Sequence, residues 1–268
     1  MQSSLERAFP PPGWTPAPWP RTRPGPAEGA VDLWLLRVPD AGAASVTLDR
    51  TPLDAEERAR AAGFARPVDG YRYAAAHLAL RRVLSAYRGV GPGELGFVRE
   101  PCPGCGAPHG RPALAGATGP HFSLSHTGGM VLIAVAGRPV GADVEGLPAP
   151  DRVAGVVEAL HPAERAAVGA APPALRPAVF ARLWARKEAY LKGLGTGLGR
   201  GPDLDYLGDP GPGAPPRPSG WTVRDVTAGP GHAAALALAH PPGAPDLTVG
   251  TFFLGTLDDT TARTLSDR

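Results

Sequence analysis

An internal repeat is the feature of this sequence that most restricts its fold. When the chain is shifted by 104 residues, segment 71–87 lies over part of segment 177–195, and both lead into a Gly-x-Gly pattern. At nearly the same shift, the strand-like "IAVA" of 133–136 lies over "LALA" of 236–239. A helix, a glycine stop and a strand that recur in one order predict two similar α/β halves. A ligand site between the halves is the natural expectation.

The repeat divides the chain into three parts. Residues 1–29 are rich in proline and are predicted to be extended or partly disordered. Residues 30–140 then form the first α/β half and residues 141–268 the second, with a disordered-looking insert at 208–220.

Periodic segments fill both halves. The expected helices are 51–65, 71–87, 161–170 and 177–195. The expected strands are 31–39, 129–137, 139–146, 221–226 and 232–240. Strands 129–137 and 139–146 are predicted to pair through the turn at Gly137–Pro139.

Charge and hydropathy exclude several classes of protein. The 268 residues hold 27 basic and 25 acidic side chains, a balance that argues against nonspecific nucleic-acid binding. No apolar run approaches the length of a membrane span. Prolines stand near the N-terminus where a signal peptide needs an apolar stretch, so we expect a cytoplasmic protein.

The strand "VGADVE" predicts a pair of carboxylates. Because side chains alternate in a strand, Gly141, Asp143 and Glu145 share one face. Two neighbouring carboxylates repel each other, so a hard cation such as Mg²⁺ suits the pair. The alternative is an exposed polar strand face, and for this motif alone that alternative is favoured.

Helix 177–195 adds a third carboxylate and the only two lysines of the chain; the other 25 basic residues are arginines. Its apolar stripe consists of Phe180, Leu183, Trp184, Leu191 and Leu194. Glu188 and Lys192 are i,i+4 neighbours on the flank of this stripe. Lys187 falls within the stripe, where an ammonium must snorkel or meet an anion. An ordinary surface Glu–Lys pair beside a snorkelling lysine is the alternative.

Two further segments carry side chains with chemical potential. Ser125 and His126 precede two glycines, and a hydroxyl, an imidazole and free amides suit a phosphate, although a structural histidine is the usual case. In "CPGCGAPHG", Cys102 and Cys105 have metal-like spacing and His109 is close. A closed zinc site usually takes four such ligands and the sequence has no second CxxC, so we interpret this segment as a tight Gly/Pro turn.

Together these motifs resemble the two-halved, surfactin-synthetase-activating type of 4'-phosphopantetheinyl transferase. The resemblance rests on the ordered motifs "GRP" (110–112), "FSLSHT" (122–127), "VGADVE" (140–145) and "WARKEAYLKGLGTGL" (184–198), and it covers about residues 50–240. It implies an α+β fold, in which two α/β halves are related by a pseudo-twofold axis with the active site between them.

The resemblance also implies roles in the second half of the chain. Asp143, Glu145 and Glu188 match the acidic residues that hold Mg²⁺ on the pyrophosphate of coenzyme A. Lys192 matches the lysine that contacts the phosphates and helps the leaving group, which makes Glu188 and Lys192 the expected catalytic residues. Glu164 resembles an acidic position sometimes given the role of a base.

Six residues are implied to bind coenzyme A besides Lys192: Arg60, Arg72, Arg111, Ser125, His126 and Lys187. Ser125 and His126 match a phosphate-binding pair, and Phe64 with Arg72 resembles the segment that grips the nucleotide. The sequence departs from the family where arginine replaces lysine at 60 and 111. Thr127 stands where serine is usual.

The implied activity is transfer of 4'-phosphopantetheine from coenzyme A to a serine of an apo acyl or peptidyl carrier protein, with release of 3',5'-ADP. Such carriers serve polyketide, nonribosomal peptide and fatty acid biosynthesis. The enzyme is expected to be a monomer with no nucleic-acid or membrane partner. Two alternatives stay open: a carrier-binding module without catalysis, and a Mg²⁺-dependent nucleotide hydrolase.

Overall fold

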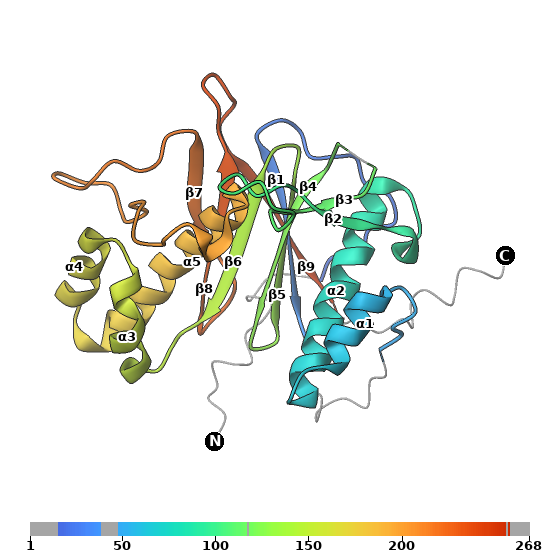
Figure 1. Ribbon diagram of the computed structural model, residues 1–268, viewed down its shortest axis with the longest axis horizontal. Coiled ribbons are helices and arrows are strands. Elements are labelled where there is room, and N and C mark those ends of the chain that lie inside the picture. The colour runs from blue at the N-terminus through green and yellow to red at the C-terminus, as the bar shows by residue number, and fades with distance from the viewer. Residues whose placement is uncertain (1–15, 39–47, 117, 256, 258–268) are drawn as a thin grey trace.

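The computed structural model describes residues 16–38, 48–116, 118–255 and 257 (Figure 1). It contains a four-stranded sheet, a three-stranded sheet and a small two-stranded hairpin, with helices packed against the two larger sheets. The predicted α+β fold is therefore confirmed, whereas the pseudo-twofold relation of the halves stays a prediction. Among the described residues, no helix is both long and apolar enough to cross a bilayer.

The four-stranded sheet has the order β4-β5-β1-β9. Its strands are β1 (Ala30–Arg37), β4 (His121–Thr127), β5 (Met130–Ala136) and β9 (Thr248–Leu254). β5 runs antiparallel to both β1 and β4, and β9 runs parallel to β1. β5 and nearly all of β1 are buried, which explains why β5 reads as a continuous apolar run and β1 as an apolar run interrupted by Asp32.

Helices α1 (Ala55–Ala62) and α2 (Pro67–Arg88) belong to the first half, and α2 lies along this sheet (Figure 1). α1 begins at Asp54, whose side chain forms a capping box with Glu57. α1 and α2 approach closely at Gly70, where an added Cβ would lie 2.2 Å from the carbonyl oxygen of Ala61. The short helix η2 (Pro92–Glu94) and the hairpin of β2 (Phe97–Arg99) and β3 (Pro112–Leu114) follow.

The three-stranded sheet has the order β6-β8-β7, and its neighbouring strands are antiparallel. Its strands are β6 (Val140–Gly146), β7 (Trp221–Val226) and β8 (His232–Ala239). The helices of this half are α3 (Pro150–Val156), α4 (Pro162–Ala170) and α5 (Arg176–Leu194), with short turns η3 (Val157–Ala159), η4 (Pro173–Leu175) and η5 (Gly197–Gly199). α5 lies directly on the sheet (Figure 1).

The two sheets meet along β4 and β6. The backbone N–H of Ala142 donates to Ser123 Oγ at 3.0 Å, and that of Val144 donates to Ser125 Oγ at 3.3 Å. A single apolar core combines residues of β1, β5, β6, β8 and β9, so the two halves share buried surface. Burial of this kind is the dominant favourable term in holding such layers together.

Most predicted elements are present, but the pairing of two strands was wrong. Strands 129–137 and 139–146 exist as β5 and β6, yet β5 pairs with β1 and β4 while β6 pairs with β8. Both edges of β5 are already hydrogen-bonded, so the turn at Gly137–Pro139 leads the chain into the other sheet. β9, which falls within the predicted second half, joins the first sheet through β1.

Three other expectations concern the segment 208–220, the ends of the repeated helices and the N-terminal segment. The segment 208–220 forms an irregular connection held in place, with Asp209 accepting from Arg182 and Arg217 donating to the carbonyl of Gly208. The helices of the repeat end at Gly89 and Gly195, both left-handed, although a shift of 104 residues aligns Gly89 with Gly193. Residues 1–15 of the proline-rich segment lie outside the described residues.

Candidate functional site

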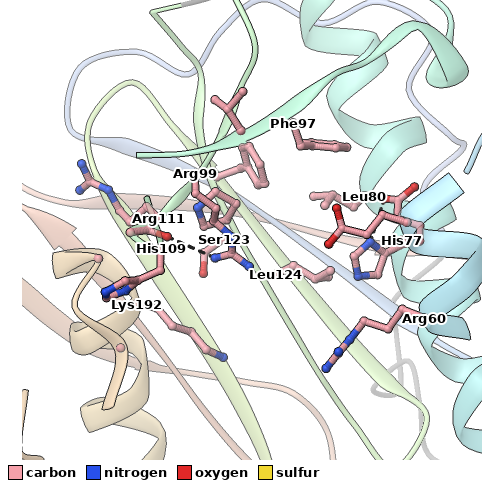
Figure 2. Close-up of a pocket in the computed structure, with 18 of the residues that line it drawn as sticks. Arg60, His77, Leu80, Phe97, Arg99, His109, Arg111, Ser123, Leu124 and Lys192 are labelled. Carbon is pink, nitrogen blue, oxygen red and sulfur yellow. Dashed lines mark hydrogen bonds and ion pairs between the residues drawn. The ribbon is translucent and has the colours of Figure 1, made fainter. Parts of the chain in front are cut away.

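A cavity of about 950 Å³ opens between elements of the two predicted halves. Figure 2 shows Arg60 and His77 on one side of it and Arg111, His109 and Lys192 on the other, with Ser123 and Leu124 of β4 between them. Basic side chains therefore lie at both ends of the cavity and suit a ligand with more than one phosphate group, while Asp54, Glu56 and Glu57 also line the end beside Arg60.

The close packing of β6 against α5 sets the geometry of the acidic residues beside this cavity. An added Cβ at Gly141 would lie 1.9 Å from the carbonyl oxygen of Ala189, so only glycine permits this approach. Since Asp143 and Glu145 share the strand face of Gly141, they also face the helix. Glu188 and Lys192, one turn apart on α5, are the helical side chains whose charges act on Glu145.

Asp143 is the centre of a buried hydrogen-bond cluster. Its Oδ1 accepts from Lys192 Nζ at 2.6 Å and from Ser125 Oγ at 2.8 Å. Lys192 Nζ also donates to Ser125 Oγ at 3.1 Å, which closes a triangle of three groups. Ser125 thus contacts Asp143 and the backbone of β6, and it is not among the residues that line the cavity.

The acidic residues carry more negative charge than Lys192 balances. Burial raises the pKa of Glu145 to about 7, and the neighbouring charges of Asp143 and Glu188 act in the same direction. Burial likewise raises the pKa of Glu188, with a further contribution from Asp143. Among the described residues, the buried Asp143 Oδ2 has no hydrogen-bond partner. An unsatisfied buried oxygen and two carboxyls with raised pKa values are the features that a bound cation would relieve.

This donor set fits a hard divalent cation. Three carboxyl groups supply only oxygen atoms, which Mg²⁺ prefers. The structure does not bring them into a tight cluster. The ligand atoms of Asp143, Glu145 and Glu188 do not all lie within 4.8 Å of one another. Lys192 Nζ forms an ion pair with Asp143 Oδ1 and supplies positive charge beside these carboxyl groups.

The end of the cavity opposite Lys192 is formed by α1, α2 and β4. Desolvation lowers the pKa of His126, and the charges of His77, Lys192 and Arg72 lower it further. His77 Nδ1 lies 2.9 Å from Glu57 Oε1, which orients its ring. Arg72 pairs with Asp69 and does not line the cavity, but its positive charge contributes to the lowered pKa of His126. A neutral His126 among cationic groups is ready to gain a proton when an anion enters.

Arg111 ties the hairpin of the first half to the end of α5. Its guanidinium donates to Glu100 Oε2 at 2.7 Å and to the carbonyl oxygen of Gly193 at 2.8 Å. Gly195, in a left-handed conformation, leaves no room for a Cβ, which would lie 2.9 Å from Arg111 Cγ. Arg111 lines the cavity, but its hydrogen bonds to Glu100 and Gly193 use much of its donor capacity.

Lys187 does not line the cavity. It is 1% exposed, and its Nζ pairs with Glu164 Oε2 at 2.8 Å and donates to the carbonyl oxygen of Asp205. Glu164 is fully buried and also accepts from the backbone N–H groups of His161 and Leu207. This placement corrects the prediction that Lys187 binds coenzyme A, and it leaves Glu164 no access to a substrate proton. The lysine survives in an arginine-rich chain because a compact ammonium fits between these buried acceptors.

Sequence reasoning missed several residues of the cavity. His77, Glu57, Tyr73, Arg99 and Ser123 all line it. Tyr73 and His77 are i,i+4 neighbours whose rings stack at 4.1 Å, a spacing that the helical period could have indicated. Arg99 and Ser123 gave no such signal, because their position depends on how the hairpin and β4 meet in space.

Comparisons with known proteins agree with the motifs. Residues 139–212 match the 4'-phosphopantetheinyl transferase superfamily. The 4'-phosphopantetheinyl transferase HetI of Nostoc is 33% identical over 153 residues, which are 55% of this chain and 62% of that protein. A 4'-phosphopantetheinyl transferase of Bacillus subtilis is 26% identical over 54% of this chain and 62% of its own length. A phosphopantetheinyl transferase of Thraustochytrium is 32% identical over 64% of this chain and 63% of its length. The chain thus spans about three fifths of these curated relatives.

Proposed function

We propose that this chain, which matches the 4'-phosphopantetheinyl transferase superfamily over residues 139–212, is a member of that superfamily and transfers 4'-phosphopantetheine from coenzyme A to a carrier-protein serine. The observation that carries the proposal is the acidic cluster of β6 and α5, joined through Lys192 to a cavity with basic ends. At about 950 Å³ the cavity is at the upper end of the range for small-molecule sites, which fits a long cofactor such as coenzyme A.

Asp143, Glu145 and Glu188 would hold Mg²⁺. When bound, the ion would supply charge neutralisation for the phosphoryl oxygens of coenzyme A. The unsatisfied Asp143 Oδ2 and the raised pKa values of Glu145 and Glu188 support this assignment.

The reaction replaces one P–O bond with another. The hydroxyl oxygen of the carrier serine bonds to the β-phosphorus of coenzyme A, and the bond from that phosphorus to the oxygen bridging to 3',5'-ADP breaks. Glu188 accepts the serine proton, a role that its raised pKa favours. The Lys192 ammonium stabilises the departing oxygen and can donate a proton to it, which arginine cannot do because it stays protonated in proteins.

The other basic groups of the cavity bind the nucleotide end in this proposal. Arg60 extends toward the cavity from α1, and His77 lies beside it (Figure 2). His126, whose pKa is lowered by desolvation and then by the nearby cationic groups, gains a proton when the phosphates arrive. Arg72 adds positive charge that acts on His126. Ser125 acts indirectly, by holding the Asp143 carboxylate in place.

The substrate is an apo acyl or peptidyl carrier protein, and the enzyme acts as a monomer. Incubation with coenzyme A, Mg²⁺ and an apo carrier protein tests the proposal by mass spectrometry. Mass gain on the carrier equal to one phosphopantetheine group supports transfer. Carrier binding without mass gain would indicate a binding module, and cleavage of coenzyme A without carrier modification would indicate a hydrolase.

A further inference from the structure

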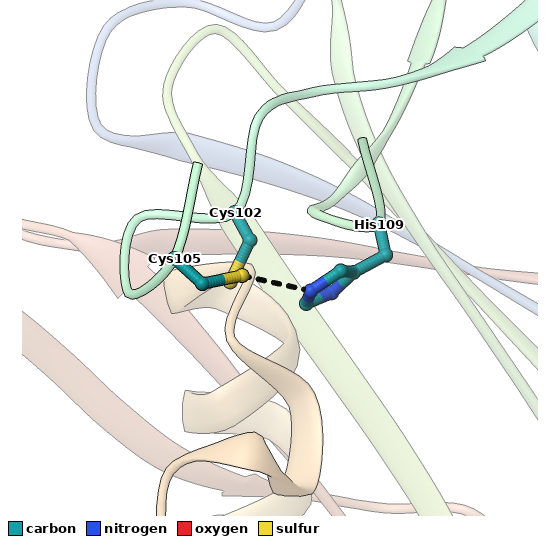
Figure 3. Close-up of side chains that lie close together, drawn as sticks. All are labelled: Cys102, Cys105 and His109. Atoms are coloured by element: carbon teal, nitrogen blue, oxygen red, sulfur yellow. Dashed lines mark hydrogen bonds between the residues drawn. The ribbon is translucent and has the colours of Figure 1, made fainter. Parts of the chain in front are cut away.

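A second cluster of ligand-type side chains lies in the connection between β2 and β3. The side chains of Cys102, Cys105 and His109 point toward one another in Figure 3. Their ligand atoms all lie within 4.8 Å of one another, and Cys105 Sγ is 3.0 Å from His109 Nε2. This cluster is separate from the carboxylates of β6 and α5, and the transfer reaction described above does not use it.

The backbone of this connection is folded tightly around the cluster. The N–H of Gly106, which is left-handed at φ 75°, donates to the carbonyl of Cys102 at 2.8 Å. The N–H of Cys102 in turn donates to the carbonyl of Ala107 at 2.8 Å. The N–H groups of Gly104 and Cys105 donate to the Cys102 sulfur and lower the pKa of its thiol. The three side chains are therefore brought together by the turn itself.

We propose that Cys102, Cys105 and His109 bind a Zn²⁺ ion, with water as the fourth ligand. Two sulfurs and an imidazole nitrogen are the donors that zinc takes in proteins, whereas Mg²⁺ and Ca²⁺ require oxygen. Zinc–ligand bonds of about 2.0–2.3 Å in a tetrahedron separate the ligand atoms by roughly 3.5–3.8 Å. The observed group needs only small side-chain movements to reach that spacing.

The missing second CxxC does not exclude zinc once His109 is placed beside the two sulfurs. Sites with three protein ligands and a water are a common zinc arrangement. Cys102 is buried and the other two ligands are exposed, so the ion would sit at the surface with room for water. Within the described part of the chain, no fourth acidic, Cys or His ligand atom belongs to this group.

The site would stabilise one wall of the cavity. Arg99 at the end of β2 lines the cavity together with His109, Gly110 and Arg111 of this connection, in which no helix or strand spans residues 100–111. Arg99 donates to the carbonyl oxygen of Gly110 at 3.2 Å, and Arg111 donates to the carbonyl oxygen of Gly193 on α5. A metal cross-link is an effective way to fix a loop that buries little apolar surface.

Metal analysis of the full chain, produced without an affinity tag and with zinc in the growth medium, tests this site. We expect about one zinc per chain after gel filtration in metal-free buffer. Cys105→Ser and His109→Ala should each weaken zinc affinity by at least about tenfold, since loss of a mere outer-shell partner already weakens metal affinity by about 10–100-fold. His232→Ala, which removes a half-buried histidine of β8 that is not part of this cluster, is the matched control and should keep its zinc.

Cobalt substitution provides a second measurement. The chain has only two cysteines, so a thiolate-to-cobalt charge-transfer band can arise only from Cys102 and Cys105. We expect this band in wild type and its reduction in Cys105→Ser. Cys105 is exposed, so its replacement should leave the fold intact, which circular dichroism checks.

Three results would overturn the proposal. They are wild-type protein without zinc, equal zinc in wild type and Cys105→Ser, and a mass showing loss of two hydrogens, which would mean a Cys102–Cys105 disulfide. None of these measurements uses coenzyme A or a carrier protein, so their outcome is independent of the transferase proposal.

Discussion

Replacement of Lys187 by alanine separates a structural role from a role in ligand binding. The ammonium of Lys187 neutralises the fully buried Glu164 at 2.8 Å. Without it, Glu164 keeps its two backbone hydrogen bonds but becomes an uncompensated buried charge. Loss of one partner of a buried pair destabilises a protein by about 3–5 kcal/mol. For a chain of this size that corresponds to a fall in Tm of roughly 6–20 °C.

The assay is thermal unfolding of the unliganded protein, followed by circular dichroism, beside calorimetric titration with coenzyme A at a temperature where the variant is folded. Arg182→Ala is the matched control, because Arg182 lies on the same helix and forms an exposed ion pair with Asp209. Loss of such a surface pair changes stability by at most about 1 kcal/mol. A Lys187→Ala protein that unfolds like Arg182→Ala but binds coenzyme A weakly would refute the structural assignment.

The remaining predictions concern the acidic cluster and its lysine. Asp143→Ala and Glu188→Ala should each abolish transfer while leaving the fold intact, because a metal ligand supplies several kcal/mol of transition-state stabilisation; near-normal turnover with Mg²⁺ would contradict the ligand assignment. Lys192→Arg should keep much of the coenzyme A affinity but lose about 10²–10⁴-fold in turnover, whereas Lys192→Ala should lose both, as steady-state transfer and calorimetry will measure. Glu145 has a pKa raised from 4.5 to about 7, so its ionisation destabilises the unliganded fold as pH rises through that window. Glu145→Gln should therefore raise Tm more at pH 8 than at pH 5 in metal-free buffer, and an equal effect at both pH values would rule out this titration.

Local patterns in the sequence predicted the elements of the site well. Strict alternation placed Asp143 and Glu145 on one face of β6, and the helical period placed Glu188 and Lys192 one turn apart on α5. These predictions succeeded because side-chain direction within one strand or helix depends on neighbours a few residues away. The order of the motifs then indicated the same family whose model residues 139–212 match.

The sequence did not predict which strands pair when they lie far apart along the chain. Nothing local in β5 indicates that both its edges are already occupied, or that β9 will return from the end of the chain to pair with β1. Strand partners depend on contacts between distant segments, and a local pattern does not encode those contacts. The predicted pair of β5 and β6 failed for this reason.

The two lysines show the same division at the level of single side chains. The sequence determined that Lys187 and Lys192 lie on one helix, with Lys187 inside the apolar stripe. Only the tertiary structure decided that Lys187 meets Glu164 in the interior, whereas Lys192 meets Asp143 beside the cavity. It likewise decided that His109 joins Cys102 and Cys105. The physical reason is that a charge is stabilised by whatever group the fold brings within a few ångströms, and that group can come from any part of the chain.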